Sequence, residues 1–255
     1  GYIMKKISLL LFILFVLANM EAQERTQPKA GKPPVVNIKT PQTFVLDNGL
    51  KVMIVENHKL PKVTFNLTLD NAPFAEGKIK GVDELTSSLI GNGSKKITKD
   101  IFNEEIEFLG ANVNFSSSGA SANSLSKYAN RILELMAEGA LNPNFTQVEF
   151  DKEKAKMLEG IKAEDKSVTG ISDRVTDALA FGKSHPSGEF ITVETLNNVT
   201  LADVETIYRN YFVPENGYLV VIGDVKYNKI KAVVEKLFGS WQKRSFEPLK
   251  GCALC

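Results

Sequence analysis

The segment 63–69 alternates strictly between large apolar and small polar side chains. Val63, Phe65, Leu67 and Leu69 fall on one face, and threonine or asparagine falls on the other. Because successive side chains of a β-strand point to opposite faces, this pattern predicts a strand that is buried on one face only. Such strands are typical of antiparallel sheets with a core on one side, so this segment constrains the fold strongly.

Further strands are predicted before and after this segment. Residues 43–55 read as a β-hairpin, because apolar residues alternate on both sides of an Asp-Asn-Gly turn. A strongly apolar run predicts a strand at 217–222. Two short paired strands are predicted at 112–118 and 122–125, in a serine-rich region.

Helical periodicity accounts for most of the remaining chain. Apolar residues recur at intervals of three and four, and glycine, proline or threonine marks several helix ends. The predicted helices cover residues 82–89, 100–109, 127–141, 146–166, 171–181, 201–211 and 227–238. Strands and helices thus come in runs, which favours an α+β fold in which an antiparallel sheet carries helices mainly on one face.

The start of the chain is expected to lie outside the folded domain. Residues 1–22 read as a signal peptide with leading residues, because a basic start precedes an apolar run too short to span a bilayer comfortably. Cleavage after Ala18 and cleavage after Ala22 both fit, and a buried core helix is the alternative interpretation. Residues 23–42 contain several prolines and read as an extended linker. This predicts a secreted, periplasmic protein that meets the membrane only through its signal peptide.

The folded domain is expected at residues 43–242 and a truncated tail at 243–255. Cys252 and Cys255 form a single C-x-x-C in this tail, and we interpret the pair as incidental because no second pair accompanies it. The chain has 31 basic and 30 acidic residues, which nearly cancel. Nothing in this balance points to nucleic acid or to an anionic membrane surface as a partner.

Several short motifs follow one another along the predicted domain. They read LDNGLKV at 46–52, IEFLGANVN at 106–114, FG..HP at 181–186, VT with YFVPEN at 199–216, and GDV with FGSW at 223–241. The segment 81–97, GVDELTSSLIGNGSKKI, lies between the first two and starts a helix at Gly81. In this order the motifs resemble the insulinase/pitrilysin-like metallopeptidases, which include the mitochondrial processing peptidases. The resemblance implies one metallopeptidase-like half-chamber domain.

The resemblance also identifies the positions where active members bind zinc. Their helix carries an inverted H-x-x-E-H motif, whose histidines share one helical face and whose glutamate acts as general base on the metal-bound water. The matching positions hold Glu84, Ser87 and Ser88, and the third family ligand, a glutamate, is replaced by Gly160. We therefore expect no zinc, no other cofactor and no catalytic residue in this chain.

His185 and Glu84 carry side chains that can take part in catalysis, and we expect neither to do so. The chain has two histidines, and neither lies in the helix that matches the zinc site. We interpret His185 as a loop residue beside Pro186 and not as a catalytic base. Glu84 is interpreted as a solvated helix residue.

Members of this family enclose peptides in a chamber of two similar halves, and often one half alone carries zinc. The resemblance therefore implies that this chain pairs with a zinc-bearing subunit or second domain and holds unfolded peptides. Asn114, Phe115 and Ser116 match the edge strand that receives extended peptide in active relatives by main-chain pairing. In the alternative interpretation, Val113 and Phe115 only fill the core beneath a serine-rich surface.

Two other functions also fit the sequence. The chain could be an active zinc metalloendopeptidase that uses atypical ligands, which zinc content and chelator-sensitive cleavage would reveal. It could also be a truncated peptidase fragment, which the abrupt end of the sequence suggests.

Overall fold

The computed structural model describes residues 40–243 together with residues 2, 4, 7 and 31. The chain divides into residues 1–38 and residues 39–255, and the fold belongs to the second of these units. Almost all of the predicted signal peptide and linker lie outside the described residues, as does the predicted tail from residue 244 onward. These predictions therefore stay predictions.

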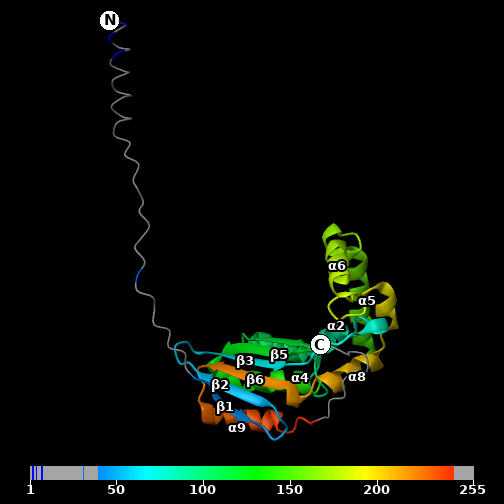
Figure 1. The fold of residues 1–255 in the computed structure, drawn as a ribbon. Helices are drawn as coiled ribbons and strands as arrows, with labels where there is room; N and C mark the ends of the chain where they lie inside the picture. The colour runs from blue at the N-terminus through cyan, green and yellow to red at the C-terminus, as the bar shows by residue number, and fades with distance from the viewer. Residues whose placement is uncertain (1, 3, 5–6, 8–30, 32–39, 244–255) are drawn as a thin grey trace. The chain divides into compact units, whose positions relative to one another are not determined.

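In the described part of the chain, six strands form one sheet (Figure 1). They are β1 (Gln42–Val45), β2 (Lys51–Glu56), β3 (Lys62–Leu69), β4 (Asn112–Ser116), β5 (Gly119–Leu125) and β6 (Gly217–Gly223). Their order across the sheet is β1-β2-β6-β3-β5-β4, so β1 and β4 are the edge strands. Every predicted strand is present, although β5 begins earlier than the sequence pattern indicated.

The alternation in β3 has the predicted consequence. Val63, Phe65, Leu67 and Leu69 are at most 4% exposed, whereas the residues between them are exposed. One face of β3 therefore lies in the core and its other face carries polar side chains. This agrees with the expectation that helices cover mainly one face.

The sheet is antiparallel, as expected, except for one pair of strands. β6 lies between β2 and β3, and it pairs parallel with β2 but antiparallel with β3. The remaining pairs are antiparallel. A parallel pair needs a long crossover, and here most of the domain's helices lie between β2 and β6 in the sequence. The alternation of side chains reports which face is buried and carries no information about the direction of a neighbouring strand.

The helices of the domain pack into two apolar clusters. The helices are α2 (Val82–Leu89), α3 (Lys99–Phe108), α4 (Ala129–Leu141), α5 (Gln147–Glu164), α6 (Val168–Phe181), α7 (Val193–Asn198), α8 (Leu201–Tyr211) and α9 (Tyr227–Phe238). Single 3-10 turns cover Gly77–Ile79, Ser126–Tyr128 and Pro214–Asn216. α4 and α9 pack on the buried face of the sheet, and α2, α5, α7 and α8 share the second cluster. In Figure 1, α2, α5, α6 and α8 gather at one end of the sheet.

Two helices differ from the sequence prediction, and side-chain caps explain both differences. α6 begins before the predicted start at residue 171, because the Ser167 side chain accepts the N–H of Gly170 at 3.3 Å and caps it. α7 was not predicted. It is too short to show a helical period, and it depends on a capping box in which Thr192 and Thr195 satisfy each other's backbone N–H groups.

Hydrogen bonds of the Asn48 side chain connect the first hairpin to the end of α9. This side chain is 7% exposed, and its amide donates to the carbonyl oxygens of Phe238 at 2.7 Å and Trp241 at 2.9 Å. Its own oxygen accepts the N–H of Leu50 at 3.2 Å.

We expect Asn48→Ala to lower the free energy of unfolding by about 2 kcal/mol, because buried partners lose their hydrogen bonds. Urea denaturation measures this loss. The exposed neighbour provides the control, since Asp47→Ala should change stability by about 0.5 kcal/mol or less, and equal losses would contradict the assignment.

His58 bridges two carboxylates in the turn between β2 and β3. Its Nδ1 lies 2.6 Å from a carboxylate oxygen of Asp224, and its Nε2 lies 3.3 Å from one of Glu56. The hydrogen bond to Asp224, followed by that to Glu56, raises the pKa of His58 above its ordinary value. A pKa raised by folding adds stability below the unfolded pKa of about 6.5, and this stability is lost as pH rises through the folded value.

The His58 bridge predicts a pH dependence of the melting temperature. We expect the wild type to melt at a higher temperature than His58→Gln near about pH 5, and the difference to disappear by about pH 8. Thermal melts of both proteins across this range measure the difference. A difference that stays constant with pH would show that protonation of His58 does not stabilise the fold.

Candidate functional site

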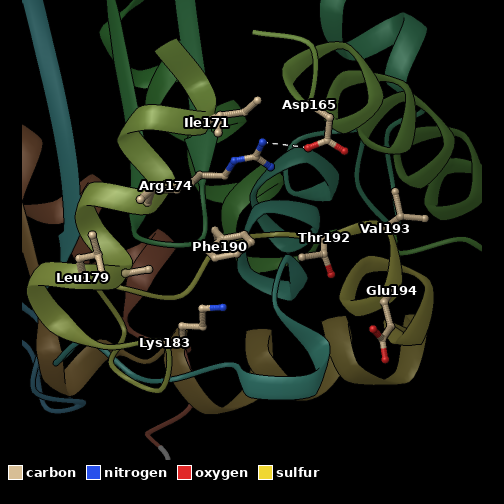
Figure 2. Close-up of a pocket in the computed structure, with 11 residues that line it drawn as sticks. Asp165, Ile171, Arg174, Leu179, Lys183, Phe190, Thr192, Val193 and Glu194 are labelled. Carbon is tan, nitrogen blue, oxygen red and sulfur yellow. Dashed lines mark hydrogen bonds and ion pairs between the residues drawn. The ribbon is translucent and has the colours of Figure 1, made fainter. Parts of the chain in front are cut away.

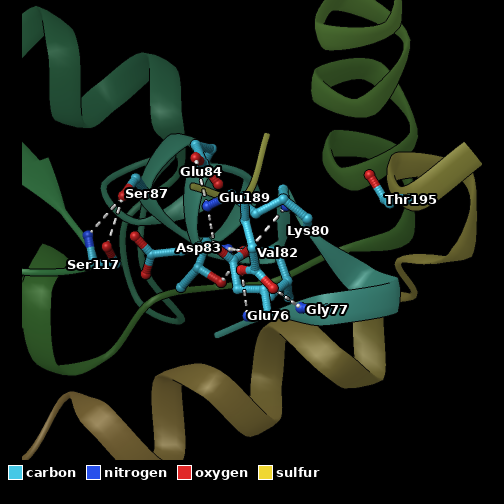
Figure 3. A network of polar contacts seen from close by, with 12 residues as sticks. Glu76, Gly77, Lys80, Val82, Asp83, Glu84, Ser87, Ser117, Glu189 and Thr195 are labelled. Atoms are coloured by element: carbon cyan, nitrogen blue, oxygen red, sulfur yellow. Dashed lines mark hydrogen bonds and ion pairs between the residues drawn. The ribbon is translucent and has the colours of Figure 1, made fainter. Parts of the chain in front are cut away.

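α2, which carries three of the four positions of the family's zinc site, begins at a buried carboxylate. The Glu76 side chain, 4% exposed, accepts the N–H groups of Gly81 at 2.9 Å and Asp83 at 3.1 Å, and it pairs with the Lys80 ammonium (Figure 3). The first N–H groups of a helix have no partner within the helix, and the helix dipole favours negative charge there. Glu76 therefore caps α2 from the segment that precedes it.

Gly81 opens α2 as the sequence predicted. Its φ is +110°, in the left-handed region that favours glycine. A Cβ at this position would lie 3.1 Å from the Leu196 side chain and 3.2 Å from the Ile191 side chain. Both the backbone conformation and the close packing of the segment around α7 therefore favour glycine here.

Glu189, in the loop before α7, extends the same network. Its two carboxylate oxygens accept the N–H groups of Glu76 at 2.9 Å and Gly77 at 2.8 Å. Sequence reasoning found neither Glu76 nor Glu189. They are 113 positions apart, and a single acidic residue in a loop belongs to no recognisable pattern.

Glu84, Ser87 and Ser88 all lie on α2. Each makes an ion pair or hydrogen bonds with other groups of the protein. The Glu84 carboxylate lies 3.5 Å from the Lys80 ammonium, and its side chain is 43% exposed, in agreement with a partly solvated helix residue. Ser87 Oγ donates to Ser117 Oγ at 2.9 Å and accepts the N–H of Ser117 at 2.9 Å, which joins α2 to the turn between β4 and β5. Ser88 Oγ donates to a carbonyl of its own helix at 3.0 Å.

The charges around the start of α2 shift one another's pKa values. Burial, and after it the charge of Glu76, raises the pKa of Glu84 above its usual value. Burial also raises the pKa of Asp83, against a hydrogen bond from Ser117 that lowers it. Burial alone would lower the pKa of Lys80, but the hydrogen bond to Glu76 and its charge outweigh burial and raise it. The positive charge beside Glu84 is therefore that of the Lys80 ammonium, whose charged form the neighbouring carboxylates stabilise.

The four positions do not fit the zinc ion that the family implies. Gly160 lies on α5, which packs against α2, and a Cβ there would meet no atom within 4 Å. The position has room for a ligand but carries none. Zinc in proteins binds imidazole, thiolate and carboxylate groups; these positions offer one carboxylate beside an ammonium and two hydroxyls in hydrogen bonds. Across the part of the chain that the structure describes, no group of three or more His, Cys, Asp or Glu side chains could hold a metal ion.

Asn114, Phe115 and Ser116 lie on β4, at the edge of the sheet. β4 pairs with β5 on one side, and in the described chain no strand pairs with its other side. The Phe115 ring packs inward, 5.9 Å from the Phe102 ring, and a Cβ at Gly91 would lie 2.1 Å from it. The side chain of Phe115 therefore belongs to the packing, as the alternative interpretation had it. The backbone of β4 keeps an unpaired edge, to which another chain can add.

His185 has the surroundings of a loop residue. Its ring stacks on Phe181 with 5.5 Å between the ring centroids, and its Nδ1 accepts the N–H of Ser187 at 3.0 Å. These contacts organise the loop that follows α6.

Two family models match this chain. The model of the insulinase family, peptidase family M16, matches residues 51–183, which contain α2 and all four substituted positions. A model described as the peptidase M16 inactive domain matches residues 198–252. The chain belongs to the insulinase family, peptidase family M16.

Curated relatives are similar at low identity. The chain is 24% identical over 208 residues to the uncharacterized zinc protease YmxG of Bacillus subtilis, a match that covers 79% of this chain and 50% of the relative. It is 23% identical over 215 residues to the β subunit of the mitochondrial processing peptidase of Blastocladiella emersonii, covering 80% of this chain and 45% of the relative. The chain thus spans about half the length of the curated relatives it matches.

Solved structures share the fold. A peptidase M16 inactive domain from Pseudomonas fluorescens superposes with a TM-score of 0.73 at 22% identity, covering 82% of this chain and 52% of that one. The periplasmic protease PqqL from Escherichia coli superposes with a TM-score of 0.67 at 18% identity, covering 83% of this chain and 25% of that one. None of the helices in the described part of the chain is long and apolar enough to cross a membrane.

Proposed function

We propose that this chain is a non-catalytic domain of the insulinase family, which pairs with a zinc-bearing subunit or second domain and helps to hold peptides. One observation carries the proposal. The family's helix keeps its opening glycine and its buried face, while Glu84, Ser88 and Gly160 stand where the zinc ligands belong and Ser87 stands where the general base belongs. The match to a model described as an inactive domain supports the same role.

Peptides would be held at the free edge of β4. An extended peptide that adds to this edge makes main-chain hydrogen bonds and demands little of the side chains of Asn114 or Ser116. Unfolded segments of varied sequence could therefore bind. We place the protein in the bacterial periplasm, which is supported by the signal-like start of the sequence and by the likeness to a protein described as a periplasmic protease.

The pairing is tested by purification from the native source. A tagged chain should bring down a zinc-bearing member of the same family in a stoichiometric complex, and that complex should cleave peptides. The tagged chain alone should not. A chain that elutes as a solitary monomer and has no affinity for peptides would contradict the proposal.

Main-chain pairing with β4 is tested with two peptides of identical sequence, one of which carries N-methyl groups on alternate backbone nitrogens. Methylation removes donors and obstructs one edge of the peptide, so we expect binding to weaken at least about tenfold. Fluorescence anisotropy of labelled peptides measures both affinities. Equal affinities would show that binding does not use the main chain.

A further inference from the structure

A hollow of about 320 Å³ lies at the end of the sheet where β3 begins. Backbone hydrogen bonds join three turns there. The N–H of Asp224 donates to the carbonyl of Lys62 at 2.9 Å, and the N–H of Ser126 donates to that of Pro61 at 3.0 Å. α2 contacts the turn between β4 and β5, which lies at the opposite end of β3. The hollow is therefore separate from the substituted zinc positions.

The charged groups of this hollow are mainly ammonium groups. Lys127, Lys226 and Lys229 line it, and among the described lining residues the one carboxylate is that of Asp224. None of the three lysines lies within ion-pair distance of a carboxylate in the described part of the chain. We call this cavity the basic hollow.

The carboxylates at the basic hollow are already engaged. Asp224 lies 2.6 Å from one ring nitrogen of His58, and Glu56 lies 3.3 Å from the other. Glu56 also accepts the N–H of Tyr227 at 2.7 Å. Even when both carboxylates are counted, the three ammonium groups leave one positive charge in excess, and protonation of His58 leaves two. The basic hollow therefore attracts anions.

In the cavity beside α6, by comparison, the charges balance (Figure 2). Arg174 lies 2.8 Å from Asp165, and Lys183 and Glu194 line the same cavity. That cavity therefore has no electrostatic preference for an anion, whereas the basic hollow has one.

Two helices start at the basic hollow. α4 follows the turn Ser126–Tyr128, and Asn130 in its first turn lines the hollow, as does Lys229 in the first turn of α9. Neither helix is capped by the side chain of its own N-cap residue. The N-terminal end of a helix carries partial positive charge and N–H donors, so both helices add to the attraction for an anion.

Ser126 gives independent evidence for a ligand. Its Oγ exposes less than 1 Å² and has no hydrogen-bond partner among the described residues, and Ser126 lines the basic hollow. Buried hydroxyl groups are nearly always hydrogen-bonded, because leaving one without a partner costs free energy. An oxyanion in the hollow would supply an acceptor for this hydroxyl.

We propose that the basic hollow binds a phosphate group. Phosphate presents its oxygens in several directions, so it can accept from ammonium groups on two segments and from the Ser126 hydroxyl at once, whereas a carboxylate has two oxygens. Inorganic phosphate, soluble phosphate esters and phospholipid headgroups share this chemistry. The inference does not rest on the proposed peptide-holding function, so neither falls with the other.

Titration of the full chain with inorganic phosphate, followed by nuclear magnetic resonance, tests the proposal. Sodium chloride keeps the ionic strength constant, and the pH is fixed. We expect the backbone amide signals of residues 126–130 and 226–230 to shift and to reach half-saturation at about 1 mM phosphate. Shifts that do not saturate, or that chloride alone reproduces, would overturn the proposal.

Two double variants locate the binding. Lys226→Gln with Lys229→Gln should weaken phosphate binding at least about tenfold, because two of the ammonium donors are lost. Lys231→Gln with Lys236→Gln is the matched control. It removes the same charge from the same helix, at positions that are not among the described residues lining the hollow. Equal weakening by both variants would show that phosphate responds only to the general charge of α9, and would overturn the assignment.

Ser126→Ala tests the unpartnered hydroxyl. We expect phosphate affinity to fall about threefold, because one hydrogen bond to the ligand is lost. The melting temperature without phosphate should not fall, since this hydroxyl has no hydrogen-bond partner among the described residues. Circular dichroism melts measure this and verify that every variant folds. Unchanged phosphate affinity would show that Ser126 does not contact the ligand.

Vesicles distinguish the two sources of the phosphate group. The full chain is sedimented with vesicles of phosphatidylcholine alone and with vesicles that also contain phosphatidylglycerol. Sedimentation with the second kind only, reversed by inorganic phosphate and lost in the Lys226→Gln, Lys229→Gln variant, would assign a lipid headgroup to the hollow. Saturable binding of inorganic phosphate without sedimentation would assign a soluble phosphate. Absence of both kinds of binding would overturn the proposal.

Discussion

Restoring the three family ligands together with the general base is expected to give this chain a zinc site. The variant combines Glu84→His, Ser87→Glu, Ser88→His and Gly160→Glu. Two histidines four positions apart on α2 would share one helical face, and the space around Gly160 admits a side chain from α5. We expect about one zinc ion per chain after dialysis against zinc and gel filtration, as measured by mass spectrometry.

The control for this experiment keeps Gly160 and changes only the three positions on α2. It should bind zinc more weakly, because one ligand of the tetrahedral set is missing. Loss of the Ser87–Ser117 hydrogen bond lowers stability in both variants alike, so it cannot explain a difference between them. A quadruple variant that folds but holds no zinc would show that the four positions do not converge, and that the assignment of Gly160 to the third ligand is wrong.

Removing the Glu76 carboxylate is expected to produce the largest loss of stability of any single polar substitution that we consider. Glu76→Ala leaves the Lys80 ammonium, 15% exposed, without its main counter-charge, and it leaves two N–H groups at the start of α2 without an acceptor. Breaking a buried ion pair from one side lowers the free energy of unfolding by about 3–5 kcal/mol. Urea denaturation measures the change.

Glu84→Ala is the matched control for Glu76→Ala, because it removes the other carboxylate that faces Lys80. The side chain of Glu84 is 43% exposed and its oxygen lies 3.5 Å from the ammonium, so we expect a loss of about 0–1 kcal/mol. If the two variants unfold at the same urea concentration, Glu76 is not the residue that caps α2.

Local patterns in the sequence predicted most of the fold. The alternation in β3 and the hairpin turn at Asn48 identified strands and their buried face, and Thr200 marked the start of α8. The position of β6 between β2 and β3 could not be predicted in the same way. It depends on pairing between strands far apart in the chain, which no local period encodes.

The candidate site was predictable as far as the family motif extends. Gly81 and the substituted positions on α2 could be placed by the resemblance alone. The network around them could not, because Glu76, Glu189 and Ser117 lie outside the motif and meet α2 only in the folded chain. The structure therefore shows which contacts hold α2 in place although the family's histidines are absent from it.

We propose that this chain keeps the family's fold without its metal, and the zinc content of the wild type tests this proposal most directly. Protein dialysed against zinc and passed through gel filtration is measured by mass spectrometry, and its cleavage of peptides is measured with and without a chelator. We expect far less than one zinc ion per chain and no cleavage that the chelator abolishes. About one zinc ion per chain, with chelator-sensitive cleavage that Glu84→Gln removes, would contradict the account.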